Sequence, residues 1–145
     1  MSPQMKMQPY ENLSPYDCIP LFNRLQSEHS PKYIIYTITT TNPSVNLITV
    51  LKSSPTRDYA SFLSDLPDKE CRYGVFSFGD DQNDTVFITW VPEGAKAEER
   101  KMFLECSVEL WGDMFGLRPI ARFDEVRGKA EILEEVVRKR ISIGL

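Results

Sequence analysis

The sequence has little of what metal binding and nucleophilic catalysis require. Among 145 residues it has one histidine, His29, and three widely spaced cysteines, Cys18, Cys71 and Cys106. No two of these cysteines form the C-x-x-C pair of common zinc sites, and no second histidine completes a cluster. A single histidine also leaves Ser/His/acid and Cys/His sets without support. The sequence therefore predicts neither a zinc site nor an enzyme.

Patterns for binding nucleotides and calcium are also missing. The chain has no G-x-x-x-x-G-K-[ST] segment, which cradles nucleotide phosphates in many enzymes. Asp80, Asp81 and Asp84 lie close together, but they lack the ligand spacing of a calcium loop and its terminal glutamate. We therefore predict no metal and no cofactor.

Long apolar runs are absent as well. No stretch of about 18 apolar residues occurs, so the sequence predicts no membrane span. Residues 1–9 lack the apolar core of a secretory signal, and the odd number of cysteines favours reduced thiols. These features predict a cytoplasmic protein. The net charge of −4 argues against nucleic acid as a partner.

What the sequence does contain is typical of a globular α/β (α+β) protein. Hydrophobic residues make up 41% and charged residues 26% of the chain, and its length suits one compact domain. The polar segment 1–12, which includes Pro3 and Pro9, predicts a flexible tail. We therefore expect a single domain over residues 13–145.

Hydrophobic periodicity predicts alternating strands and helices along this domain. Strands are expected at 32–41, 45–52, 72–78 and 85–91, with a short fifth at 119–123. Helices are expected at 14–30, 58–66, 97–114 and 129–142. The strands are apolar on both sides, which predicts a central mixed sheet of five to six strands flanked on both faces by helices.

Three phrases in this order resemble the ADF/cofilin homology superfamily. They are Tyr33-Ile-Ile-Tyr36, Leu66-Pro-Asp-Lys-Glu-Cys-Arg-Tyr73 and Phe87-Ile-Thr-Trp-Val-Pro92. The resemblance extends from about residue 13 to 141. It implies a mixed sheet between helix pairs, binding to actin or actin-related proteins, no enzymatic activity, and association with the cytoskeleton.

The resemblance also implies a site for actin monomers on the long helix and the N-terminus. The family's helix motif resembles Arg-x-Lys-Met, and Lys101 and Met102 match its last two positions. Its first arginine falls on Glu99, and the neighbouring Arg100 compensates in our interpretation. Ser2 matches a serine near the family's N-terminus, and it is either a regulatory phosphosite or an ordinary serine of the polar tail. Phosphate there would add negative charge and repel an acidic partner.

The charge of the long helix departs from the family's pattern. A later family lysine falls on Ser107. Between residues 93 and 115 the chain has six acidic and three basic residues, a net charge of −3. Actin is acidic, so we expect this helix to be steered toward it less strongly than a basic helix.

The second family surface, which binds filaments, is only partly retained. The connection before the fourth strand is acidic and has no basic residue. The last helix keeps Glu134, Arg138 and Arg140. We therefore expect actin monomers as the main partner, with weak or absent severing of filaments. The basic cluster 138–140 also suits phosphoinositide head groups.

Two alternatives remain open. Gly94-Ala-Lys-Ala-Glu98 resembles a phrase of the glia maturation factor branch, which binds the Arp2/3 complex and removes actin branches. The other alternative is an interaction module that kept the fold and lost actin binding, with Trp111 or the basic last helix serving another partner.

Overall fold

The computed structural model describes residues 4–7, 25, 32–41, 45–54, 58–78, 84–110 and 121–143. The predicted first helix lies outside this part of the chain except for Leu25, which is helical and buried. Ser2, His29 and Trp111 also lie outside it, as do Asp80 and Asp81.

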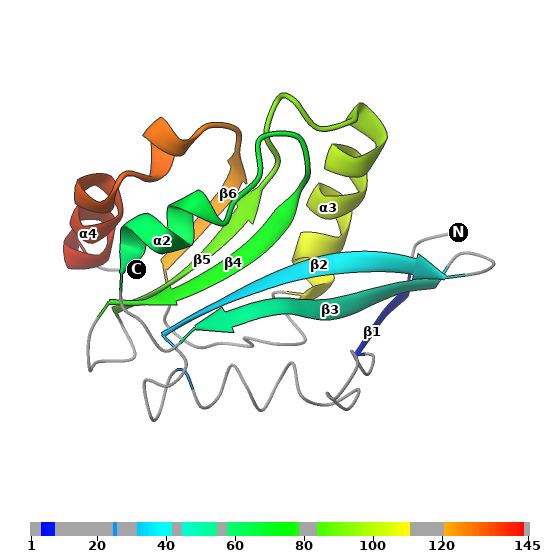
Figure 1. The fold of residues 1–145 in the computed structure, drawn as a ribbon, viewed down its shortest axis with the longest axis horizontal. Coiled ribbons are helices and arrows are strands. Elements are labelled where there is room, and N and C mark those ends of the chain that lie inside the picture. Colours follow the sequence, from blue (N-terminus) through cyan, green and yellow to red (C-terminus); the bar gives the residue numbers. More distant parts are fainter. Residues whose placement is uncertain are drawn as a thin grey trace.

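Six strands form one mixed sheet in the order β1-β3-β2-β4-β5-β6 (Figure 1). The inner neighbours β3, β2, β4 and β5 pair antiparallel, whereas β1 and β6 pair parallel to β3 and β5. This confirms the predicted mixed sheet. The strands are β1 Gln4–Met7, β2 Tyr33–Thr41, β3 Val45–Ser54, β4 Arg72–Ser77, β5 Thr85–Trp90 and β6 Ala121–Val126.

Helices cover both faces of this sheet. They are α2 Tyr59–Ser64, α3 Ala97–Leu110, the short 3-10 helix η3 Lys129–Ile132, and α4 Glu134–Ile143. The side chain of Asp58 caps α2 by accepting a 3.0 Å hydrogen bond from the backbone N–H of Ala60. In the part of the chain that the structure describes, no helix has the length and apolar composition needed to span a bilayer.

Alternation along the strands divides the core into two layers. Successive residues of β2 point to opposite faces. One layer joins β2, β4 and β5 to α3 through Tyr36, Tyr73, Phe87, Phe103 and Cys106. The other layer joins the same strands to α2, η3 and α4. Figure 1 shows α2 and α4 next to each other at the left of the view. The buried residues of this second layer include Tyr33, Tyr59, Phe62, Phe76, Trp90, Ile132 and Val137.

Aromatic rings fill the second layer. Tyr59 meets Phe76 edge to face at 5.0 Å, and Tyr33 stacks on Phe76 at 5.9 Å between ring centroids. Such pairs contribute roughly 0.5–1.5 kcal/mol each beyond the burial of their area. Gly74 makes room for this packing, because a Cβ there would lie 2.6 Å from Phe62 Cζ.

Four residues of the segment 1–12, for which the sequence predicts a flexible tail, form a strand. Gln4–Met7 form β1, which pairs in parallel with Val45–Ile48 of β3. Without this partner β3 would expose a row of unpaired backbone groups, which strand addition satisfies. The polar–apolar alternation of Gln4, Met5, Lys6 and Met7 has the period of a strand and signals this pairing.

The last helix corrects a second prediction. Residues 129–142 form η3 and then α4, with Leu133 between them in an extended conformation at ψ 151°. The carbonyl of Leu133 accepts the first backbone bonds of α4, from Val136 and Val137. The break buries Ile132 and Val137 fully but leaves Leu133 42% and Val136 39% exposed, although all four side chains are apolar.

Candidate functional site

A tight connection from β5 sets the position of α3, the long helix. The backbone N–H of Ala95 donates to the carbonyl of Pro92 at 3.0 Å, which closes a turn before the helix. Gly94 packs so closely that a Cβ would meet the carbonyl oxygen of Asp68 at 2.5 Å. Glu98 and Glu99 lie in the first turn, where the helix dipole favours negative charge.

One stripe of α3 faces solvent as a ridge. It consists of Glu98, Lys101, Glu105 and Val108, which are all exposed. The Lys101 side chain is 77% exposed and its ammonium lies 3.9 Å from the Glu105 carboxylate, so this ion pair is loose. Val108 adds an apolar side chain that is 65% exposed. The structure therefore places the predicted contact residue Lys101 where a protein partner can reach it.

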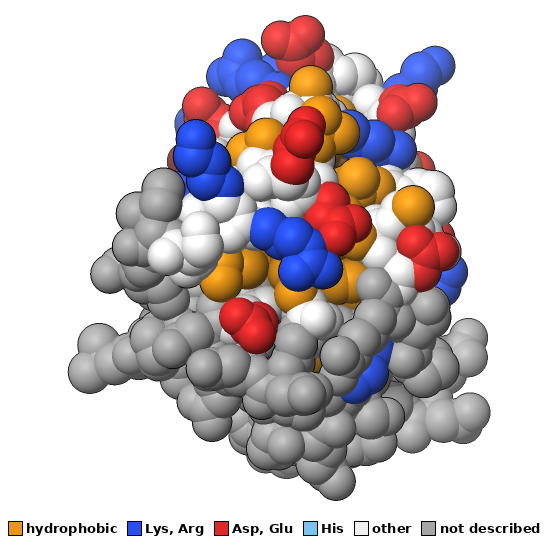
Figure 2. Space-filling model, turned by 90° about the vertical axis from the view of Figure 1, so that its left-hand side faces the viewer, with side chains coloured by type: hydrophobic (Ala, Val, Ile, Leu, Met, Phe, Trp, Pro, Cys, Tyr) orange, Lys and Arg blue, Asp and Glu red, His pale blue; other side chains and the backbone are white. Residues whose placement is uncertain are grey.

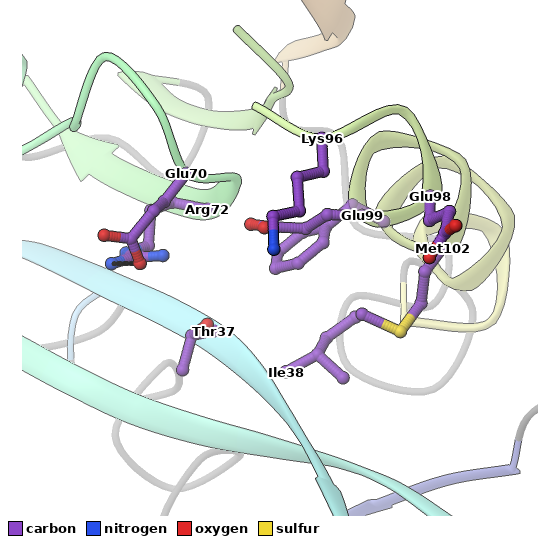
Figure 3. A pocket seen from close by; sticks show the side chains of 9 residues that line it. Thr37, Ile38, Glu70, Arg72, Lys96, Glu98, Glu99 and Met102 are labelled. Atoms are coloured by element: carbon purple, nitrogen blue, oxygen red, sulfur yellow. Dashed lines mark hydrogen bonds and ion pairs between the residues drawn. The ribbon is translucent and has the colours of Figure 1, made fainter. Parts of the chain in front are cut away.

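Met102 lies on one flank of this ridge, where it lines a pocket of about 410 Å³. Figure 3 shows its side chain extending toward Ile38 of β2. Glu70 and Arg72 lie on the opposite side of the pocket, and Lys96 and Glu98 lie on the helix side (Figure 3). Met102 is half-buried against the α3 core layer, so it offers a partner only part of its surface.

Glu99 is a structural residue. Its carboxylate accepts a 2.6 Å hydrogen bond from the backbone N–H of Cys71, the residue directly before β4. This bond attaches the first turn of α3 to the sheet. The charge of Glu99 is therefore directed into the molecule. The net charge of −3 over residues 93–115 thus overstates the negative charge that a partner meets on the ridge.

Arg100 lies on the opposite flank from Met102. It lines a second pocket, of about 270 Å³, between α3 and the end of β6. Lys101 and Arg127 line the same pocket. Nothing in the sequence pattern indicates that Arg127 lies beside α3, because this contact depends on the parallel pairing of β6 with β5.

The predicted residues of the last helix lie on the other face of the sheet. Arg138 Nε donates to Glu134 at 2.7 Å, and its guanidinium lies 4.5 Å from the centroid of the Phe78 ring. The Arg140 guanidinium lies 5.3 Å from the centroid of Phe123. Figure 2 views the side on which α2 and α4 lie, where acidic and basic side chains alternate over exposed apolar ones. The two arginines of α4 are therefore already engaged with other side chains of the molecule.

The N-terminal segment approaches α3 through its backbone. Ser2 lies outside the described residues, but β1 begins two residues later and contacts α3. The structure thus brings together the two segments that the resemblance assigns to monomer binding. It does not bring α4 to them, because α4 packs on the opposite layer.

The buried ionisable groups beneath α3 are poorly suited to chemistry. Burial, with the nearby Glu99 carboxylate, raises the pKa of the Cys71 thiol to about 12. Burial likewise raises the pKa of Tyr73, whose hydroxyl donates to the carbonyl of Phe103 at 2.6 Å. Both groups stay neutral near pH 7 and serve packing. Among the described residues no group of His, Cys, Asp and Glu is arranged to hold a metal ion.

Comparison with protein families gives one match over most of the chain. The family model for the cofilin/tropomyosin-type actin-binding protein matches residues 12–142. Actophorin from Acanthamoeba castellanii is 27% identical over 129 residues, which cover 86% of this chain and 90% of actophorin. Cofilin from Schizosaccharomyces pombe is 29% identical over 131 residues, covering 85% and 93% of the two chains.

Solved structures agree with this match. The crystal structure of Streptomyces griseoflavus cofilin superposes with a TM-score of 0.74 at 27% identity, covering 88% of this chain and 95% of that one. Human coactosin-like protein superposes with a TM-score of 0.69 over 99% and 100% of the two chains. At 13% identity this second likeness shows the fold alone.

Proposed function

We propose that this chain, which belongs to the family of cofilin/tropomyosin-type actin-binding proteins, binds actin monomers through the α3 ridge and the adjoining N-terminal segment. The observation that carries this proposal is the position of Lys101 and Met102. Lys101 is exposed at the centre of the ridge, Met102 flanks it, and β1 contacts the same helix. These are the family positions that the sequence retains.

The anchoring of α3 supports this role. A helix that grips a large partner has to hold its side chains in one orientation before binding. The bond from the Cys71 N–H to Glu99 fixes the first turn, and Phe103 and Cys106 bury the inner side of the helix. Lys101 and Met102 are thus presented by a rigid element.

Severing of filaments is weak or absent in this proposal. The family surface for filaments combines a basic connection between the strands that correspond to β4 and β5 with charged residues of the last helix. Here that connection is acidic, and Arg138 is held by Glu134 and Phe78. Actin binding in turn favours the cytoplasm and the cytoskeleton as its location. Binding of phosphoinositides by 138–140 and binding of Arp2/3 stay predictions from the sequence.

Two assays with the purified full chain test this proposal. Titration into fluorescently labelled actin monomers should give saturable binding, and co-sedimentation with filaments should recover little of the protein. An absence of monomer binding at concentrations on the order of tens of micromolar would reject the proposal. Strong pelleting together with rapid shortening of filaments would reject its second half.

A further inference from the structure

The lining of the pocket between α3 and β6 contains both apolar and charged residues. Val91, Ala97 and Leu104 form the apolar part of its lining. Three basic and two acidic side chains complete the lining: Arg100, Lys101, Arg127, Glu105 and Glu125. With one more base than acid, the pocket favours an anionic group over a cationic one.

Arg100 is the incompletely satisfied member of this lining. Its Nε atom is enclosed by protein and has no hydrogen-bond partner. An enclosed donor without a partner costs roughly 1–3 kcal/mol relative to a bonded one. The enclosed Nε is closed to a ligand, so a carboxylate entering the pocket would bond to the two terminal nitrogens of the guanidinium, which present parallel donors to its two oxygens.

The two acidic residues of the pocket pair only loosely with Lys101 and Arg127, so these two bases are available to a ligand. Lys101 Nζ lies 3.9 Å from Glu105, and Arg127 lies 3.8 Å from Glu125. Both distances exceed those of a charge-assisted hydrogen bond. All four side chains are about half exposed or more, so water weakens these ion pairs further.

The end of β6 is built to hold Arg127 at this place. The pairing of β5 with β6 shifts register between Ile88 and Trp90, and Glu125 has a positive φ of 53°. Beyond this irregularity the backbone N–H of Val91 donates to the carbonyl of Val126 at 2.8 Å. Glu131 then accepts the backbone N–H groups of Arg127 and Gly128 at 3.0 and 2.9 Å. A positive φ at a residue with a side chain is costly, and such strain is concentrated at functional positions.

We infer that this pocket is a receptor for an acidic side chain of the protein bound on the α3 ridge, with Arg100 as its main ligand and Arg127 as its second. The inference rests on the proposed function, because it adds a carboxylate subsite to the same binding face. It also gives Arg100 a role different from the one expected from the sequence. In this role Arg100 does not compensate for the family arginine that falls on Glu99. It serves a pocket on the flank of the ridge instead.

The test measures binding of the full chain to labelled actin monomers at low salt for five variants. Arg100→Ala and Arg127→Ala each remove a base, whereas Glu125→Gln removes the acid that competes for Arg127. Lys69→Ala is the matched control, since Lys69 is exposed on the connection between α2 and β4. Thermal unfolding of each variant verifies that it is folded.

We expect Arg100→Ala to weaken binding about tenfold or more, and Arg127→Ala several-fold. Arg100→Lys should restore only part of the loss, because an ammonium cannot hold a carboxylate with two parallel bonds. Glu125→Gln should strengthen binding, and Lys69→Ala should leave it unchanged. The difference between the wild type and Arg100→Ala should shrink as salt is raised.

Two results would overturn the inference, and they are distinguishable. If the wild type binds and folded Arg100→Ala and Arg127→Ala behave like Lys69→Ala, the pocket has no role while the proposed function stands. If the wild type does not bind actin monomers at all, both are overturned.

Discussion

The α3 ridge and the α4 surface carry similar kinds of charge but differ in how that charge is used. Lys101 on α3 is 77% exposed and only loosely paired with Glu105. Arg138 on α4 is bonded to Glu134 at 2.7 Å and lies over Phe78. The more basic helix is thus the one whose arginines are already engaged. Counting charges along the sequence does not identify the available surface, whereas their partners in the fold do.

A paired set of double variants should separate the two surfaces most strongly. Lys101→Glu with Met102→Ala reverses the ridge charge and removes the flanking apolar contact. We expect a loss of about 100-fold or more in affinity for actin monomers, since central contacts carry most of the binding energy. Titration of labelled actin measures it.

The matched pair on α4 is Arg138→Glu with Val136→Ala, which changes the same kinds of group. Its affinity for monomers should stay within a few-fold of the wild type. A larger loss from the α4 pair than from the α3 pair would reverse the comparison.

The anchor of α3 gives the next largest effect. Glu99→Ala leaves the buried backbone N–H of Cys71 without its acceptor, which should cost about 1–3 kcal/mol of unfolding free energy. Chemical denaturation measures this cost. Glu98→Ala is the control, because Glu98 is exposed in the same first turn. Equal stability of the two variants would show that the bond to Cys71 does not hold the helix in place.

Removing an engaged basic residue from α4 should lower the unfolding free energy less than Glu99→Ala does. Arg138→Ala removes one exposed ion pair and one contact with an aromatic ring, which together should be worth about 0.5–1 kcal/mol of stability. Lys101→Ala, which breaks only a loose pair on α3, should leave the unfolding free energy nearly unchanged. If Lys101→Ala destabilised the protein more than Arg138→Ala does, the engaged basic residues would lie on the ridge rather than on α4.

The smallest expected effect is a change of stability with pH, caused by Asp65, which bonds to β2 and β3. Burial opposes ionisation of Asp65, but hydrogen bonds from Lys52 and Tyr33 outweigh it and lower the pKa of Asp65 below its ordinary value of 3.8. This stabilisation is present above that ordinary value and is lost as the pH falls through the lowered pKa. Asp65→Asn should therefore destabilise the protein at pH 7 more than at pH 2. Denaturation curves at both pH values would test this, and an equal cost at both would contradict it.

Much of the fold could be predicted from the sequence because local signals agreed with the tertiary packing. The Tyr, Ile and Thr residues of 32–41 and the helical spacing of Tyr59 and Phe62 indicated β2 and α2. The pairing of β1 was missed because a four-residue strand acquires its stability from β3. The break at Leu133 was missed because it depends on burying Ile132 and Val137 together against the sheet.

The candidate site was only partly predictable for a similar reason. Lys101 and Met102 could be proposed as contact residues because they match a helix motif. The roles of Glu99 and Arg127 depend on contacts with Cys71 and with α3, which lie far away in the chain. Motif matching cannot show whether a charged side chain points to solvent or bonds to a distant backbone group.

Hydrogen exchange of the full chain with and without actin monomers is the most direct test of the α3 ridge as the binding face. We predict that actin slows exchange in α3 and β1, whereas α4 exchanges at the same rate in both states. Protection confined to α4, with α3 unaffected by saturating actin, would contradict the account.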